Sequence, residues 1–126
     1  MEKFLLVCLG GALGSGARYL VGEWSLAQLG KGFPWGTLAV NVLGSFAIAL
    51  VIHAADVKPD LSFNWRLFLT AGILGGFTTY SAFNQETLSS FETGELAKAF
   101  GYAAITLLAC LVGGYAGLCV GRAAFG

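Results

Sequence analysis

The feature that most constrains this chain is its division into four long apolar segments, at roughly residues 3–29, 33–55, 65–91 and 96–122, joined by short connections. A helix needs about 20 apolar residues to cross the hydrocarbon core of a bilayer. Only 11% of the residues are charged, against roughly 25% in a soluble domain, which is too few to cover a water-facing surface. We therefore predict an all-α, multi-pass protein of the cell membrane, with a single integral membrane domain over residues 1–126 and four transmembrane helices.

Several other classes fit the composition poorly. The net charge is zero, which gives no basis for binding nucleic acid. The three cysteines lie inside apolar segments without a C-x-x-C motif, so we expect small buried apolar residues rather than disulfides or metal ligands. The first segment could be a signal peptide, with Lys3 before it and small residues near Ser15. Cleavage would leave three crossings and remove Arg18, so a retained helix is favoured.

The third segment contains a stretch that does not favour a continuous helix. Residues 75–83 read Gly-Gly-Phe-Thr-Thr-Tyr-Ser-Ala-Phe, in which two glycines precede two β-branched threonines. Each of these residue types lowers helix propensity. Broken backbone at membrane depth is tolerated only where protein or a polar cavity satisfies the freed carbonyl and amide groups. We therefore predict that the third helix is broken and that the break is a functional site.

Polar and small residues recur at helical spacing in the apolar segments. Thr37, Asn41 and Ser45 share one face of the second segment, and a mid-membrane Asn needs hydrogen-bond partners, as either packing contact or lining of a polar path. Beyond the break, Glu86 must be paired or near water. The face that presents aromatic and polar groups there consists of Tyr80, Phe83, Asn84 and Thr87. The spaced glycines Gly10 and Gly14, and Gly113, Gly117 and Gly121, predict close helix packing.

The cations are divided between the two sides of the predicted bundle. Four crossings place both termini on one side, with Lys3, Lys58, Arg66 and Arg122, and leave Arg18, Lys31 and Lys98 on the other. An excess of Lys and Arg on the cytoplasmic side normally sets orientation, so this chain can insert both ways. Two inverted copies could pair as an antiparallel homodimer, which would place equivalent breaks back to back in mid-bilayer.

The combined motifs resemble those of the dual-topology fluoride channels of microbes. The resemblance is carried by residues 75–83, by Gly36-Thr37-Leu38-x-x-Asn41 and by Gly14-x-x-x-Arg18, and it spans essentially the whole chain. It implies an inverted homodimer with two fluoride pores along its interface and passive fluoride efflux, without catalysis. It also implies one structural sodium ion at the dimer centre, bound by the backbone carbonyls of Gly75 and Thr78.

The same resemblance implies a set of pore residues. They are Asn41, Tyr80, Ser81 and Phe83, with Arg18 near a pore entrance. The amide of Asn41, the hydroxyls of Ser81 and Thr37, and the positively polarised edges of aromatic rings all suit an anion. A fixed cation deep in the pore would trap the ion, whereas conduction needs weak sites. The chain departs from the family pattern at Tyr80, usually Phe, at Ala82, usually Thr or Ser, and at Asn84, where a smaller hydroxyl residue is common.

Three alternatives come from other classes. Small dual-topology, proton-coupled multidrug exporters have the same size, but they rely on a carboxylate in the middle of the first helix, and this apolar run has none before Glu23. An intramembrane enzyme using Ser81 or His53 lacks a recognisable catalytic arrangement. A purely structural helix-packing subunit would leave the broken third helix without a purpose.

Overall fold

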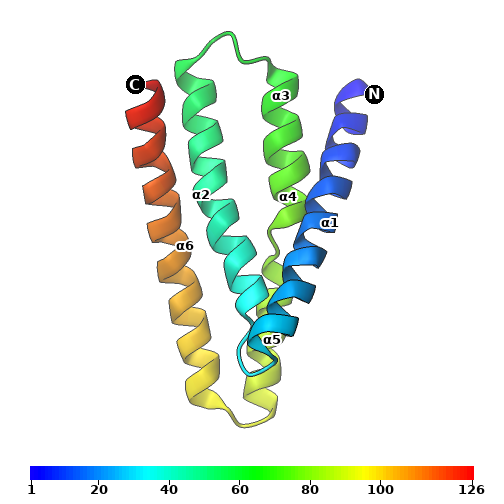
Figure 1. Cartoon of the computed structure of the whole chain (residues 1–126), viewed down its shortest axis with the longest axis vertical. Coiled ribbons are helices and arrows are strands. Elements are labelled where there is room, and N and C mark those ends of the chain that lie inside the picture. Colours follow the sequence, from blue (N-terminus) through cyan, green and yellow to red (C-terminus); the bar gives the residue numbers. More distant parts are fainter.

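The computed structural model describes all 126 residues, which form a bundle of helices. Three helices are long and apolar enough to span a membrane: α1 (Glu2–Leu29), α2 (Trp35–Val57) and α6 (Leu96–Phe125). An interrupted helix makes the remaining crossing. Both termini lie at one end of the bundle together with the α2–α3 connection (Figure 1). The predicted fold class, four crossings with a broken third, is confirmed.

The third crossing consists of four pieces. These are α3 (Phe63–Leu67), the π-helix η1 (Phe68–Leu74), α4 (Gly75–Phe77) and α5 (Tyr80–Glu92). We expected the two glycines to help open the helix, but Gly75 is helical, with φ −61° and ψ −38°. The backbone leaves the helix only at Thr78 (ψ 156°) and Thr79 (ψ 113°). The interruption therefore falls on the β-branched pair, whose side chains favour extended backbone.

The glycines serve helix packing, as predicted. A methyl group on Gly10 would lie 2.8 Å from the Gly72 Cα of η1, and one on Gly14 would overlap the Ile73 carbonyl. On the other side of the bundle, a methyl group on Gly117 of α6 would overlap the Phe46 carbonyl of α2. Small residues thus let α1 approach the broken crossing, and α6 approach α2, at backbone distance.

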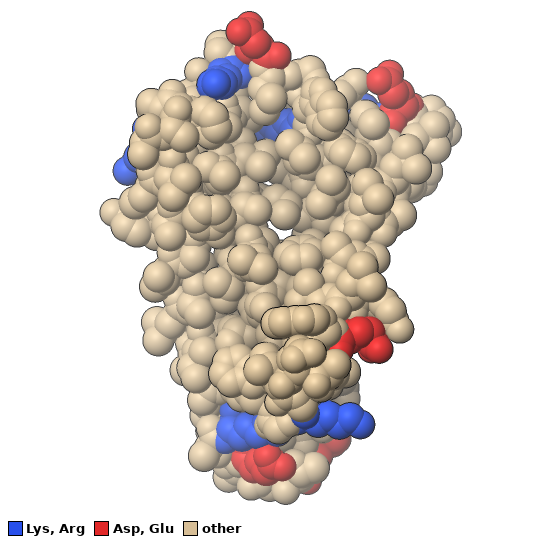
Figure 2. Space-filling model, in the orientation of Figure 1, with Lys and Arg blue, Asp and Glu red and all other residues tan.

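Most of the surface of a single chain is open. Only 14 of 126 residues are buried, and the buried apolar residues are Val40, Ala99 and Tyr102. Figure 2 shows charged side chains gathered toward the two ends, with mostly uncharged surface between them. The expectation that the cysteines are buried is wrong for Cys8 and Cys119, which are exposed. An apolar side chain on the outer face of a membrane helix needs no protein cover, because lipid is as apolar as the core.

Candidate functional site

A cavity of about 910 Å³ lies beside the helix break and is lined by α2, the broken crossing and α6. Five predicted site residues line it: Asn41, Gly75, Thr78, Tyr80 and Phe83. The other three, Thr37, Ser81 and Arg18, do not contribute to its wall. The further polar or charged lining residues are Ser45, Arg66, Thr70 and Thr106. The structure thus brings most of the predicted residues to one side of the break.

Asn41 holds the break open with both ends of its side-chain amide. Its Nδ2 donates to the Thr79 carbonyl at 3.0 Å, and its Oδ1 accepts from the Thr79 amide at 2.8 Å. Ser45 Oγ donates to the Asn41 carbonyl at 2.7 Å. Gly44, close to Asn41 on α2, leaves room for the Thr78 side chain against this helix. A polar group buried in a membrane needs partners, and here Asn41 and the broken backbone satisfy each other.

The break leaves two carbonyl groups without their helical partners. In a continuous helix the Thr79 amide would donate to Gly75 and the Ala82 amide to Thr78, four residues back. The Thr79 amide donates instead to Asn41, and the Ala82 amide donates to Thr79 Oγ at 3.2 Å. The carbonyls of Gly75 and Thr78 therefore lose their usual helical donors, and both residues line the cavity.

Arg18 occupies another carbonyl of the same turn. Its Nε donates to the Gly76 carbonyl at 2.9 Å. This contact places the guanidinium at the depth of the break, within α1, rather than in a connection at one end of the bundle. The charge of Arg18 therefore belongs to the break, and it adds little to the cations of the loop side with which it was counted.

A row of aromatic rings extends from the break toward α6. Phe83 packs edge-on against Tyr80, with ring centroids 5.6 Å apart, and at a tilt against Tyr102 at 5.1 Å. Tyr102 in turn meets Phe33 at 5.2 Å, nearly perpendicular. Tyr102 is 1% exposed, whereas Tyr80 is 77% exposed on the cavity side. Edge-on packing presents the positive rims of the rings to their surroundings.

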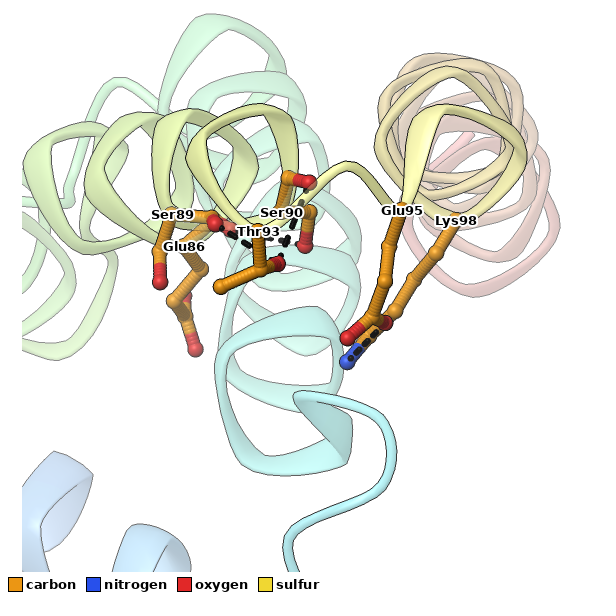
Figure 3. A network of polar contacts seen from close by, with 6 residues as sticks. All are labelled: Glu86, Ser89, Ser90, Thr93, Glu95 and Lys98. Carbon is orange, nitrogen blue, oxygen red and sulfur yellow. Dashed lines mark hydrogen bonds and ion pairs between the residues drawn. The ribbon is translucent and has the colours of Figure 1, made fainter.

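Glu86 lies one helical turn beyond these rings and is paired, as expected. Its carboxylate accepts from Thr37 Oγ of α2 at 3.1 Å and from the Tyr102 hydroxyl of α6 at 3.2 Å. Its backbone carbonyl accepts from Ser90 Oγ at 3.1 Å. Figure 3 shows this end of α5, where Thr93 bonds back to the carbonyls of Ser89 and Ser90. The carboxylate thus joins three helices.

Sequence reasoning missed two residues of α6. Tyr102 donates to Glu86 and packs on Phe83. Thr106, 8% exposed, lines the cavity, and its hydroxyl has no hydrogen-bond partner. Their spacing of four residues, continued by Cys110 on the same wall, could have indicated a polar face, but the glycines of this segment indicated packing alone.

Comparisons with known proteins agree with this architecture. The family described as "CrcB-like protein, Camphor Resistance (CrcB)" matches residues 5–118. Three similar curated proteins carry the name "Fluoride-specific ion channel FluC". The one from Anaeromyxobacter sp. (strain K) is 55% identical over 92% of each chain. One from Thermus thermophilus is 48% identical over 100% of this chain and 98% of its own. The one from Agrobacterium fabrum (strain C58) is 46% identical over 99% of this chain and 100% of its own. With its membrane-spanning helices, this multi-pass membrane protein belongs to the CrcB-like family.

Proposed function

We propose that this chain is a fluoride-selective ion channel, not an enzyme, and that it gives passive efflux of fluoride across the cell membrane. Its relatives bear that name over nearly their whole lengths. The observation that carries the proposal is the break at Thr78–Thr79, which is held open by Asn41 beside a cavity with aromatic edges. No fixed cation lines the cavity at the break, so an anion there meets only neutral donors.

Three neutral groups offer positive character to fluoride. Asn41 uses one amide hydrogen on Thr79 and keeps a second, since a side-chain amide has two donors. The Thr106 hydroxyl lines the cavity and lacks a partner. The edges of Phe83 add a weaker attraction. Fluoride is strongly hydrated, so several such contacts must replace its water, and each must be weak enough to release it.

We propose further that Thr37 and Ser81 extend this path beyond the cavity wall. Thr37 Oγ reaches Glu86 at 3.1 Å, and Ser81 Oγ lies 3.4 Å from Thr79 Oγ. Both hydroxyls therefore lie next to groups already described, one beside the carboxylate and one beside the break. A hydroxyl can rotate between acceptors, so each can turn its hydrogen toward a passing anion.

The assembly we propose is an antiparallel homodimer with two pores along its interface and one structural sodium ion at its centre. The carbonyls of Gly75 and Thr78 fit such an ion, because both have lost their helical donors. Oxygen ligands of this kind suit a hard cation. When bound, sodium supplies a positive charge that offsets the carbonyl dipoles of the two breaks. Arg18 contributes by occupying the Gly76 carbonyl, which leaves the other carbonyls to the ion.

Reconstitution tests the function directly. Liposomes loaded with fluoride or chloride, and made permeable to potassium, should lose fluoride rapidly and retain chloride once the purified protein is present. Equal loss of both anions would contradict selectivity. Loss of neither, combined with proton-driven movement of a hydrophobic cation, would favour the exporter alternative, although α1 carries carboxylates only at Glu2 and Glu23, outside its middle.

The antiparallel assembly has its own test. Several lysines added to one end of the chain should force a single orientation and abolish fluoride flux. Co-expression with a copy biased the opposite way should restore it. A singly oriented population that conducts at the normal rate would contradict the inverted dimer while leaving the channel function intact.

A further inference from the structure

One charged side chain lines the cavity. Arg66, in the last turn of α3, contributes to its wall, and every other lining residue is uncharged. Its Nη1 lies 3.5 Å from Asp56 Oδ1 near the end of α2, and the two side chains are 42% and 61% exposed. The pair therefore spans from α2 to the broken crossing, at the end of the bundle that carries the termini.

Arg66 is far from the break along the helix. At a rise of about 1.5 Å per residue, it lies roughly 18 Å from Thr78, whereas the Debye length is about 8 Å at physiological ionic strength. Its charge is therefore largely screened at the break and acts at the mouth of the cavity. Arg66 can attract an anion to the mouth without trapping it at the narrow part of the path.

The partner of Arg66 makes the charge adjustable. An exposed ion pair contributes little free energy in water, so the guanidinium can exchange the Asp56 carboxylate for an incoming anion. Thr70, one turn further along, also lines the cavity and bonds through its Oγ to the Arg66 carbonyl at 2.8 Å. This bond fixes the backbone from which the Arg66 side chain extends.

We propose that Arg66 and Asp56 form a capture site for small inorganic anions at the mouth of the cavity. Arg66 attracts the anion, and Asp56 competes for the guanidinium and limits how long the anion is held. The inference rests on the proposed channel function. It assigns to this pair the supply of fluoride to the break, while selectivity belongs to the groups at the break.

A matched charge change separates this role from a general surface effect. Lys58 lies two residues from Asp56 at the same end of the bundle, but its ammonium sits 4.8 Å from the Phe125 ring centroid and it does not line the cavity. Arg66→Gln and Lys58→Gln therefore remove the same charge from the same side. Any change in insertion bias or overall surface charge should be common to both.

Initial fluoride efflux from liposomes, measured at low fluoride and at two ionic strengths, tests the site. At low salt we expect Arg66→Gln to lower the rate about 3- to 10-fold, within the range of electrostatic steering, and Lys58→Gln to stay within about twofold of the wild type, a change too small for steering. The difference should shrink at high salt, and chloride should remain excluded. Asp56→Asn should raise the rate at low salt, a gain that misfolding cannot produce.

The double variant Arg66→Gln/Asp56→Asn should match Arg66→Gln alone, because the carboxylate acts only through the guanidinium. Equal effects of the Arg66 and Lys58 variants, a salt-independent loss, or an Asp56 effect that persists without Arg66 would each overturn the capture site. If the wild type itself moved no fluoride, the channel function would fail first, and the result would be distinguishable from a failure of the site.

Discussion

Replacing Asn41 with Ala should close the break and stop fluoride flux. Asn41 satisfies both the amide and the carbonyl of Thr79, and each buried backbone group left without a partner costs about 1–3 kcal/mol. The open break would therefore lose about 2–6 kcal/mol relative to a helix in which the Thr79 amide returns to the Gly75 carbonyl. At 1.4 kcal/mol per factor of ten, even the lower limit shifts that equilibrium about 30-fold.

Fluoride efflux from liposomes measures the result, with chain folding and assembly checked by size-exclusion chromatography in detergent. Asn64→Ala is the matched control, because the Asn64 side chain bonds only to Glu2 at an exposed position, and it should conduct normally. The Asn41 variant should also require more sodium for any residual flux, since closing the helix engages the Gly75 carbonyl. An assembled Asn41→Ala protein with wild-type flux would refute the idea that this amide keeps the break open.

Three further predictions concern packing and the pathway. Gly14→Ala should lower the thermal stability in detergent by about 1–3 kcal/mol, because its methyl group meets the backbone of the broken crossing; Gly16→Ala, with open space around it, should be neutral or stabilising, and equal effects would contradict the packing. Tyr80→Phe should retain fluoride flux, since its side chain is exposed and the ring is kept; an inactive variant would show that the hydroxyl is required. Glu86→Gln should reduce the flux several-fold, at about 1.4 kcal/mol per tenfold, because one of two donated hydroxyls loses its acceptor, whereas Glu92→Gln at the exposed end of α5 should not; matching rates would remove Glu86 from the path.

The number and nature of the crossings follow from apolar length, because a bilayer leaves few alternatives to a helix. The position of the break was less certain. The glycine pair promised flexibility, yet Gly75 and Gly76 stay helical, with Gly76 in close contact with α1, and the extended residues are Thr78 and Thr79. Propensity alone does not say whether a membrane glycine serves a bend or a contact.

The partners within the site could be predicted only in part. Asn41 stood out because an amide in mid-membrane needs partners, but its partner Thr79 is 38 residues away, and no local pattern identifies it. Tyr102 was overlooked because α6 reads as an apolar, glycine-rich packing helix. Its importance arises from two contacts with α5, one to Phe83 and one to Glu86, which exist only once the helices are assembled.

The π-helix at Phe68–Leu74 has a consequence for how this chain can change in length. A π-turn accommodates one residue more than an α-turn, and each residue of an α-helix turns the chain by about 100°. Removing one residue from this segment would rewind it as an α-helix and rotate everything that follows by that angle. Gly76 would then turn away from α1, and Thr79 away from Asn41. Insertions and deletions should therefore be tolerated in the end connections but not here, because the extra residue sets the direction in which the break faces.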